Sequence, residues 1–568
     1  MGKKIVIVGG VAGGASVAAR LRRLDAQAEI LILEQGEHVS FSNCCLPYHL
    51  GGVVPQEEAL VLMTPQRFKN QHDIDVRTGN RVRRICREKK QVEVEELATG
   101  RVYWESYDKL ILSPGASPLR PASIPGSDSG HVFTLRNVAD VHQIREFVSV
   151  EECRQIVVVG GGFIGMEVAE NLHKAGKTVT LVEGLEQVMA PFDEDMVQIL
   201  HKELMDQGLK LYLGTRVISI EQDHVTVQRG EERFALPAQA VILAIGVRPE
   251  TQLAQEAGLR IGETGGIWTD SNFRTSDEDI YAVGDAIESY DRMARKKGRL
   301  ALAGPAQRQA RAAASHICGI PSPNRGFIGS SCVQVFSQNA ACTGMNEKAA
   351  QKAGIPYDFA YVLPPDKPGL MPDSHYMAFK LLFEVPTGRI LGAQAIGKGN
   401  VDKRVDVVAA MISMGATLED LAELELCYSP VFGTARDVVN MAALVGKNLL
   451  EGRLRQVPVT QVRSLVEQGA YIVDVREEGE FAAGHLKGAH NIPLSQLRQR
   501  MEEIPRDVPV YLHCRTSQRS YYAYACLQGH GYSNVWNISG SFLGISLYEY
   551  FTDQDQGREP ILTAYNFN

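Results

Sequence analysis

Residues 155–165 of this chain read Gln155-Ile-Val-Val-Val-Gly-Gly-Gly-Phe-Ile-Gly165, and this stretch decides the fold. An apolar strand, a glycine-rich turn and a following helix form a unit that binds pyrophosphate at the helix N-terminus. Gly160 and Gly162 allow the tight turn and the close approach of a phosphate, while Gly165 allows the helix to pack closely on the strand. The spacing therefore predicts a nucleotide-binding βαβ unit.

A carboxylate follows at the end of the next predicted strand, residues 178–182. Glu183 at this place can accept hydrogen bonds from both hydroxyls of a ribose and would repel a 2′-phosphate. Strand, glycine loop, helix and acid in the expected order favour a dinucleotide site over a glycine turn without a ligand. They also favour NADH over NADPH.

The same order of elements occurs at the start of the chain. An apolar run is followed by Gly9-Gly-Val-Ala-Gly-Gly14, and Glu34 ends the next apolar run. In this loop Val8 stands where the first glycine is expected, so that only Gly10 and Gly13 keep the glycine spacing. Two such units in one chain predict two dinucleotide sites.

Length, net charge, the N-terminal sequence and the cysteine spacing argue against several classes of protein. The 568 residues exceed a usual domain several times, so three or four domains are expected. A formal net charge of -8 argues against nucleic acid or an anionic membrane as partner. The N-terminus becomes glycine-rich too soon for a signal peptide or spanning helix, so a cytoplasmic location is expected. The ten cysteines contain no Cys-x-x-Cys pair, so no metal site is predicted, and most are expected to be buried thiols.

Two further motifs follow, Ala-Ile-Gly-Val-Arg-Pro at 244–249 and Tyr-Ala-Val-Gly-Asp at 281–285. With the two glycine loops they resemble the flavoprotein disulfide reductases that have two dinucleotide folds. The resemblance implies that the first loop binds FAD and that Asp285 contacts its ribityl chain. The residues implied for FAD are Gly9, Gly10, Ala12, Gly13, Glu34, Gln35, Asn43, Val82, Ser113, Gly115, Gly284, Asp285 and Ala303.

The same resemblance assigns the second loop to the nicotinamide cofactor and places Glu167 beside it. The residues implied for NAD are Gly160, Gly162, Phe163, Ile164, Gly165, Glu167, Glu183 and Gly246.

The segment Ser40-Phe-Ser-Asn-Cys-Cys-Leu-Pro-Tyr48 follows the first nucleotide unit. Many disulfide reductases carry a Cys-x-x-x-x-Cys pair at this place, and this chain does not. A single working cysteine must form a mixed disulfide, a persulfide or a sulfenate with an external partner.

This pattern resembles the single-cysteine branch of the family, whose members include coenzyme A-disulfide reductase, persulfide reductase, NADH oxidase and NADH peroxidase. Cys44 matches the redox cysteine of that branch. Cys45 stands where glycine is usual, which permits either a vicinal disulfide or a space-filling role. The first glycine loop lacks the histidine found in the peroxidases, which argues against a peroxidase.

Residues 425–432, Glu-Leu-Cys-Tyr-Ser-Pro-Val-Phe, resemble the same branch. The resemblance implies that Tyr428 reaches the disulfide from the partner subunit and protonates the leaving thiolate, the alternative being an ordinary half-buried aromatic. Leu370 and Met371 occupy the place of a second helper tyrosine, which puts coenzyme A disulfide in doubt as the main substrate. Positions that resemble substrate and coenzyme A phosphate ligands are Arg20, Arg22, Arg23, Ser40 and Arg308, although helix arginines are often simply solvated.

Three motifs near the C-terminus, at residues 471–481, 484–493 and 510–520, occur in the order found in single-domain rhodaneses and resemble that family. A strand places Cys514 in a loop of backbone NH groups, and the next helix N-terminus and Arg519 add positive potential. These features predict a reactive thiolate that carries a persulfide, the alternative being a core cysteine. Four residues separate Cys514 from Arg519, one fewer than in cysteine phosphatases, which favours sulfur over phosphate.

The predicted fold class is α/β, with two Rossmann-like dinucleotide-binding domains, an α+β dimerisation domain and a C-terminal α/β rhodanese domain. The predicted boundaries are 1–115 and 247–324 for a discontinuous FAD-binding domain, 116–246 for the NAD(P)H-binding domain, 325–447 for dimerisation, 448–457 for a linker and 458–568 for the rhodanese domain.

The sequence thus predicts a homodimeric enzyme that passes electrons from NADH through FAD to Cys44. Its predicted substrate is a small-molecule persulfide, polysulfide or disulfide, with coenzyme A as a candidate ligand and Cys514 as the carrier of sulfane sulfur. The alternatives are a coenzyme A-disulfide reductase, an NADH oxidase that uses Cys44 as a sulfenate, and a rhodanese domain that docks on or feeds sulfur to a separate protein.

Overall fold

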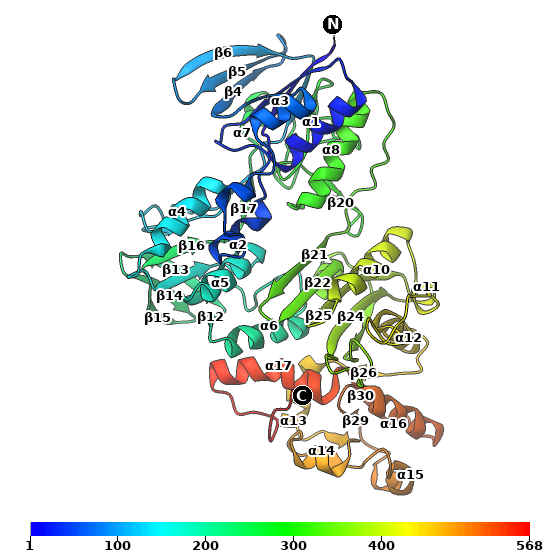
Figure 1. Cartoon of the computed structure of the whole chain (residues 1–568). Helices are drawn as coiled ribbons and strands as arrows, with labels where there is room; N and C mark the ends of the chain where they lie inside the picture. The colour runs from blue at the N-terminus through cyan, green and yellow to red at the C-terminus, as the bar shows by residue number, and fades with distance from the viewer. Residues whose placement is uncertain (1, 568) are drawn as a thin grey trace. The chain divides into compact units, whose positions relative to one another are not determined.

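The computed structural model describes residues 2–567, which divide into two compact units (Figure 1). The first unit holds the residues up to 185 together with 212–327. The second holds 186–211 and the residues from 328 onward. The units are described separately below.

A five-stranded parallel sheet forms the core of the first nucleotide fold. Its order is β18 (Ile280–Ala282), β7 (Lys109–Leu112), β1 (Lys4–Val8), β2 (Glu29–Leu33) and β3 (Asp75–Arg77). The central strands are runs of buried Val, Ile and Leu, as expected for a parallel sheet covered on both faces. Because β18 pairs with β7, two distant segments of the chain build this sheet.

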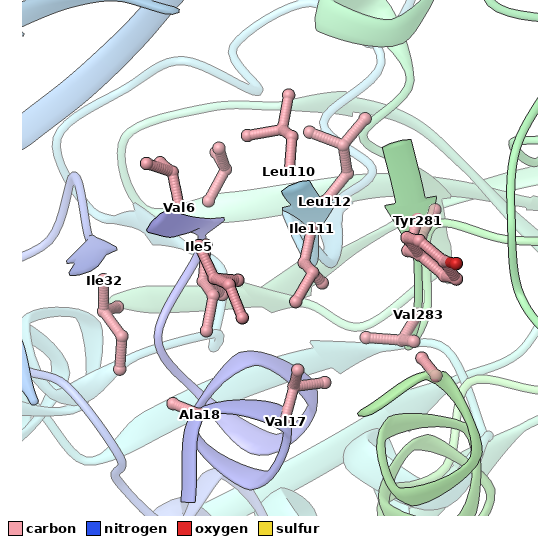
Figure 2. Packing of buried hydrophobic residues seen from close by; sticks show 14 of the residues in the cluster. Ile5, Val6, Val17, Ala18, Ile32, Leu110, Ile111, Leu112, Tyr281 and Val283 are labelled. Carbon is pink, nitrogen blue, oxygen red and sulfur yellow. The ribbon is translucent and has the colours of Figure 1, made fainter. Parts of the chain in front are cut away.

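Helices α1 (Ala12–Leu24) and α8 (Ala303–Ile317) pack against each other beside this sheet. The buried face of α8 is rich in alanine, which lets the two helix backbones approach closely. Side chains of the sheet alternate between its faces. Figure 2 shows Val6, Leu110 and Leu112 on one face, and Ile5 and Ile111 on the face toward Val17 and Ala18 of α1.

A second sheet repeats this architecture. Its order is β12 (Lys210–Tyr212), β11 (Thr178–Val182), β10 (Gln155–Val159), β16 (Ala240–Leu243) and β9 (Val132–Phe133). Helix α5 (Phe163–Lys174) follows β10 as α1 follows β1, and α4 (Val138–Ser149) precedes β10. The strands β10, β11 and β16 therefore correspond to β1, β2 and β7.

This correspondence corrects the reading of the first glycine loop. Val8 is the last residue of β1, as Val159 is the last residue of β10. The loop therefore begins at Gly9, and Val8 does not replace a glycine.

The helix-packing glycine of the first loop is Gly14 rather than Gly13. A Cβ on Gly14 would lie 1.8 Å from the Gly9 carbonyl oxygen, and a Cβ on Gly165 would lie 1.8 Å from the Gly160 carbonyl oxygen. The first loop departs from the Gly-x-Gly-x-x-Gly pattern at Val11, the residue before α1.

Each nucleotide fold carries a three-stranded antiparallel sheet. These are β4 (Asn80–Cys86), β5 (Gln91–Glu96) and β6 (Arg101–Ser106) in the first fold, and β13 (Thr215–Ile220), β14 (His224–Arg229) and β15 (Glu232–Pro237) in the second. The chain passes between the folds at β8 (Ala116–Pro118) and β17 (Val247–Pro249), which pair with each other. Smaller elements are α3 (Pro65–His72), α7 (Gln252–Glu256), β19 (Ser289–Asp291) and β20 (Lys296–Gly298).

A short 3-10 helix, Asn43–Cys45, continues into α2 (Leu46–Leu50). Helix α2 packs against α4 and α5 of the second nucleotide fold. A Cβ on Gly51 would lie 2.3 Å from Asn171 Oδ1 of α5, so the close approach of the two helices requires glycine there.

The second unit contains an antiparallel sheet. Its order is β21 (Ser330–Val335), β22 (Gln338–Gly344), β25 (Ile390–Gly397), β24 (Met377–Glu384) and β23 (Tyr357–Val362). Its helices are α9 (Glu347–Lys352), α10 (Val401–Met414), α11 (Leu418–Ala422) and α12 (Val438–Leu450). Helix α6 (Glu194–Asp206) also belongs to this unit, although the chain enters it from the second nucleotide fold.

A buried ion cluster joins α6 to this sheet. The Nζ atom of Lys380 lies 2.8 Å from Asp195, 3.3 Å from Asp193 and 2.5 Å from Glu347. The three carboxylates are close enough together to hold a cation, and the lysine ammonium already places one positive charge among them.

A five-stranded parallel sheet ends the second unit. Its order is β26 (Gln456–Val457), β30 (Val535–Ile538), β29 (Val510–His513), β27 (Tyr471–Asp474) and β28 (His490–Asn491). The helices around it are α13 (Val462–Glu467), α14 (Glu478–Ala482), α15 (Leu497–Arg500), α16 (Gln518–Gly529) and α17 (Ser541–Gln556). Helix α17 packs against α6.

The predicted α/β class is confirmed, and three details differ from or add to the sequence reading. Helix α12 continues to Leu450 and β26 begins at Gln456, so the joint between these elements is shorter than residues 448–457. Of the ten cysteines, only Cys153, Cys342 and Cys514 are buried, so most are not core thiols. Within residues 2–567, no helix combines the length and apolar character needed to cross a bilayer.

Candidate active sites

Both glycine loops begin with a backbone conformation that excludes side chains. Gly9 has φ +90° and Gly160 has φ +107°. A Cβ at these positions would lie 2.2 Å from the Ser113 carbonyl oxygen and 2.4 Å from the Ala244 carbonyl oxygen, respectively. Glycine is therefore required at both positions, where each loop passes the next parallel strand.

Each glycine loop donates a backbone hydrogen bond to the glutamate that follows the next strand of its βαβ unit. Glu34 accepts a hydrogen bond from the Gly10 NH at 2.8 Å, and Glu183 accepts one from the Gly161 NH at 2.6 Å. The other oxygen of each carboxylate accepts from the NH two residues further along the chain, at 2.8 Å in both cases. Carboxylate oxygens have further lone pairs, so ribose hydroxyls can still bind there.

The second glycine loop is accessible to solvent at Gly162. Gly162 is exposed, and a Cβ built on it would meet no atom of the described residues within 4 Å. Phe163 and Ile164 begin α5, and Glu167 lies one turn further along this helix. Gly246, with φ +111°, stands between β16 and β17 at the same edge.

Ser113 lies at the carboxyl end of the first sheet. A Cβ on Gly13 would lie 2.6 Å from Ser113 Oγ, and a Cβ on Gly284 would lie 3.6 Å from it. The glycine loop and the residues that follow β7 and β18 therefore lie close together, near the Ser113 hydroxyl.

Two polar groups near this edge fit a bound cofactor. Asp285 lies 3.7 Å from Arg136 Nη1, and burial raises the pKa of Asp285 while Arg136 opposes that shift. The Oδ1 atom of Asn43 is buried and has no hydrogen-bond partner among residues 2–567. An orphaned buried acceptor is costly unless a bound group donates to it.

The other residues implied for FAD are distributed along this fold. Ala12 and Ala303 are the first residues of α1 and α8, respectively. Gln35, directly after Glu34, is exposed, and Val82 of β4 packs against the hydrophobic core. Gly115 has φ +76° and lies close to the Arg136 side chain.

Cys44 is exposed in the 3-10 helix that leads into α2, and its thiol is free. Surrounding protein atoms, followed by the negative charges of Glu167, Cys45 and Asp285, raise the pKa of the Cys44 thiol. Glu167, which was expected beside the nicotinamide cofactor, thus acts electrostatically on the Cys44 thiol.

Glu167 is hydrogen-bonded to a tyrosine of α2. The Tyr48 hydroxyl donates a hydrogen bond to Glu167 Oε1 at 3.1 Å. Burial raises the pKa of Glu167 to about 7, the Tyr48 hydrogen bond lowers it, and the charge of Glu170 raises it further.

The arginines of α1 do not form one cluster. Arg22 donates to the backbone carbonyls of Asp25, Ala26, His72 and Asp73, so it holds two turns together and its expected role in phosphate binding gains no support. The charge of Arg20 acts to lower the pKa of Cys318, which lies at the C-terminal end of α8. Arg308 lies on α8 as well, but about 15 Å from Cys318 toward the N-terminus of the helix. Arg23 and Arg308 are exposed.

Ser40, also expected at the substrate site, adopts a left-handed backbone conformation in the first fold. It has φ +49°, and its NH donates to the Gly10 carbonyl oxygen at 2.9 Å. The segment that carries Cys44 is therefore hydrogen-bonded at its start to the first glycine loop.

Tyr428 lies in the second unit and is 52% exposed, so it is not a core aromatic. Leu370, at the place of the missing helper tyrosine, is 96% exposed on the loop before β24. Both side chains are therefore accessible to solvent. The expected role of Tyr428 at Cys44 remains a prediction.

Cys514 follows β29 at the bottom of a loop that leads into α16, and it is 1% exposed. Its NH donates to Ser541 Oγ at 3.2 Å, and its carbonyl oxygen accepts from the Phe542 NH at 3.0 Å. Ser520 Oγ donates to the Cys514 sulfur at 3.6 Å. The first turn of α16 therefore presents a hydroxyl to this sulfur.

The charge of Arg519 is compensated by an acid. Its two terminal nitrogens donate to the two oxygens of Glu480 at 2.6 and 2.7 Å. Arg519 lies near enough to Cys514 for the two charges to interact. The expectation that Arg519 adds a free positive charge is therefore modified, because Glu480 neutralises much of it.

Sequence reasoning missed Tyr48, Arg136, Glu480 and Ser520. Tyr48 and Ser520 lie inside the quoted motifs, and their hydroxyl groups were the available signal. Arg136 and Glu480 contact their partners across 149 and 39 residues, respectively, and no local pattern marks such contacts.

Comparison with known protein families agrees with this architecture. The family described as pyridine nucleotide-disulphide oxidoreductase matches residues 3–310, and its dimerisation domain matches residues 330–438. A rhodanese-like domain matches residues 458–547. The chain belongs to the pyridine nucleotide-disulphide oxidoreductases and carries a C-terminal rhodanese-like domain.

Individual relatives are similar over most or all of the chain. A coenzyme A disulfide reductase from Staphylococcus haemolyticus is 33% identical over 449 residues, which are 79% of this chain and 100% of that protein. The crystal structure of reduced Bacillus anthracis CoADR-RHD is 40% identical, covers 98% of this chain and 99% of its own, and has a TM-score of 0.93. An NAD-dependent persulfide reductase from A. fulgidus is 33% identical, covers 95% and 99%, and has a TM-score of 0.90.

Proposed function

We propose that this enzyme uses NADH to reduce persulfides, polysulfides or low-molecular-weight disulfides at Cys44, and that Cys514 carries the sulfane sulfur. The observation that carries the proposal is the presence of two differently built cysteine sites in one chain. Cys44 is exposed near the charge of Glu167, whereas Cys514 is buried and its sulfur accepts a hydrogen bond from the Ser520 hydroxyl of α16.

The first nucleotide fold fits FAD. Gly9, Glu34 and Asp285 would hold its phosphates, ribose and ribityl chain, and the unpaired Asn43 Oδ1 offers an acceptor. Bound FAD supplies two-electron transfer between a nicotinamide and a sulfur atom.

The second fold would bind NADH through the open loop at Gly162, the helix N-terminus of α5 and Glu183. Glu183 is negatively charged next to the ribose position, so the 2′-phosphate of NADPH would be repelled there.

Cys44 is the proposed nucleophile. Its thiolate attacks the inner sulfur of a persulfide, forms a mixed disulfide with the thiol carrier and releases hydrosulfide. The electron pair and hydrogen from NADH then cleave the mixed disulfide, which regenerates the Cys44 thiolate and releases the carrier as a free thiol. The net reaction converts one persulfide and NADH into one thiol, one hydrosulfide and NAD+.

Cys514 is proposed to receive and present the sulfur that Cys44 reduces. The backbone NH groups and the Ser520 hydroxyl can stabilise a persulfide anion on Cys514. A homodimer, in which Tyr428 serves the partner subunit, and a cytoplasmic location complete the proposal.

The proposal is tested by mixing NADH-reduced enzyme with coenzyme A persulfide, polysulfide, coenzyme A disulfide and oxygen in parallel. Wild-type enzyme is expected to oxidise NADH rapidly with the sulfur compounds, and Cys44→Ser is expected to lose this activity. Rapid oxidation by oxygen, with all sulfur compounds inert, would refute the proposal.

A coenzyme A-disulfide reductase is the second candidate, because the similar staphylococcal and Bacillus anthracis proteins carry that description. The replacement of a helper tyrosine by Leu370 and Met371 argues against it as the main activity. The ratio of kcat/KM for the persulfide to that for the disulfide decides between the two.

A further inference from the structure

Tyr48 links the redox-cysteine segment to the second nucleotide fold. Its hydroxyl donates to Glu167 Oε1 at 3.1 Å, across 119 residues of sequence. Its carbonyl oxygen accepts hydrogen bonds from the NH groups of Val53 and Val54, at 3.0 and 3.3 Å. The residue is therefore fixed through both its backbone and its side chain.

The helix that carries Glu167 is also held in place. The Asn171 side chain donates to the Glu167 carbonyl oxygen at 2.8 Å, and the same side chain is in close approach to Gly51 at the end of α2. Helices α2 and α5 thus pack against each other, and the hydrogen bond between Tyr48 and Glu167 joins them.

The carboxylate that Tyr48 holds acts on the Cys44 thiol. Glu167 is the largest charged contributor to the raised pKa of Cys44, after the loss of solvent contact. Cys45, from the same 3-10 helix, and Asp285, from the loop after β18, act in the same direction. Arg136 partly offsets the charge of Asp285.

We propose that Tyr48 is a positioning residue of the reductase site, whose hydroxyl fixes the Glu167 carboxylate beside Cys44 and so controls the charge against which the Cys44 thiolate forms. The inference rests on the proposed role of Cys44 as the redox cysteine. It assigns a function to Tyr48 that is separate from electron transfer and from substrate binding.

The charges around Glu167 give the direction of the effect. Burial is the main reason why the pKa of Glu167 is raised to about 7. The hydrogen bond from Tyr48 lowers this pKa, and the charge of Glu170 raises it. Glu170 is itself paired with Lys174. The ionised carboxylate opposes a neighbouring thiolate, and the protonated carboxyl does not. Without the Tyr48 hydroxyl, Glu167 stays protonated to higher pH, so the Cys44 thiolate forms at lower pH.

The test is the pH dependence of iodoacetamide alkylation at Cys44 in the purified holoenzyme, followed by peptide mass spectrometry between pH 6 and 10. The variants are Tyr48→Phe, Glu167→Gln and the double variant. Tyr107→Phe is the matched control, because it removes a buried hydroxyl that faces Arg87 and Asp277 in the same unit.

In Tyr48→Phe the alkylation rate at pH 7.5 is expected to rise about threefold, with the profile shifted to lower pH. Glu167→Gln is expected to shift the profile in the same direction, and adding Tyr48→Phe to it is expected to cause no further shift. A Tyr48→Phe profile that superimposes on the wild type, or an equal shift in the Glu167→Gln background, would overturn the inference.

Failure of the proposed function is recognised separately. If Cys44→Ser still reduces persulfide with NADH, the redox role of Cys44 is wrong whatever the alkylation profiles show. If Cys44→Ser is inactive while Tyr48→Phe leaves the profile unchanged, only the positioning role is wrong.

Discussion

Arg519 and Glu480 form a two-point ion pair next to Cys514, with N–O distances of 2.6 and 2.7 Å. Because both of its terminal nitrogens are bound to this carboxylate, the guanidinium exerts a reduced positive field at the sulfur. The pair therefore connects α14 with α16 and sets how much of the arginine's charge the sulfur experiences.

Neutralising Glu480 should make Cys514 more reactive. In Glu480→Gln the Arg519 charge is no longer compensated, so the rate of Cys514 alkylation at pH 7 is expected to rise about two- to fivefold. Arg519→Ala is expected to lower the rate by a similar factor. The exposed Arg498→Ala serves as control, and equal rates in all four proteins would contradict the account.

Nucleotide preference should depend on Glu183. Glu183→Gln keeps one acceptor oxygen for the loop NH groups and removes the charge that repels a 2′-phosphate. The kcat/KM ratio of NADH to NADPH is expected to fall about tenfold or more, measured by steady-state turnover with the same acceptor. Glu186→Gln, at a neighbouring exposed acid, provides the control, and an unchanged ratio in Glu183→Gln would show that another residue selects the cofactor.

His201 should make the stability of the second unit dependent on pH. The ring is fully buried on α6 against Phe551, and burial lowers the pKa of His201 to about 3. The unfolded chain takes up a proton near pH 6.5 and the folded chain does not, so stability is lost as pH falls below that value. Between pH 7.5 and 5 this loss amounts to about 2 kcal/mol.

The measurement is the thermal unfolding midpoint at both pH values. His201→Gln is expected to show a smaller decrease between pH 7.5 and 5 than the wild type, whereas the exposed His490→Gln is expected to match the wild type. An identical decrease in all three proteins would assign the pH dependence to other groups.

Removing the buried ammonium of Lys380 should destabilise the second unit strongly. Lys380→Met leaves Asp193, Asp195 and Glu347 close together without a cation, a change that typically costs about 3–5 kcal/mol. The unfolding midpoint is expected to drop well below that of the exposed Lys398→Met control. A drop no larger than the control would show that the carboxylates are accommodated without the lysine.

Local patterns in the sequence predicted the two nucleotide folds well. Gly160 and Glu183 lie within one βαβ unit, so their spacing reports a geometry that the chain forms locally. The first loop was misread at Val8, because the residue that begins such a loop is defined by its backbone conformation, here φ +90° at Gly9. Spacing between glycines alone does not reveal that conformation.

The electrostatic partners of the sites were outside the reach of sequence patterns. Arg519 was recognised from its distance to Cys514, but its charge is balanced by Glu480 from another helix. Tyr48 was part of the quoted redox segment, yet its partner Glu167 is 119 residues away. Tertiary packing determines these contacts, and no periodicity or motif encodes them.

The most direct test of the account is a single-turnover experiment with enzyme that carries a labelled persulfide on Cys514. After anaerobic addition of one equivalent of NADH, wild-type enzyme is expected to release labelled hydrosulfide, and Cys44→Ser is expected to retain the label on Cys514. Release of labelled hydrosulfide from Cys44→Ser at the wild-type rate would contradict the central role of Cys44.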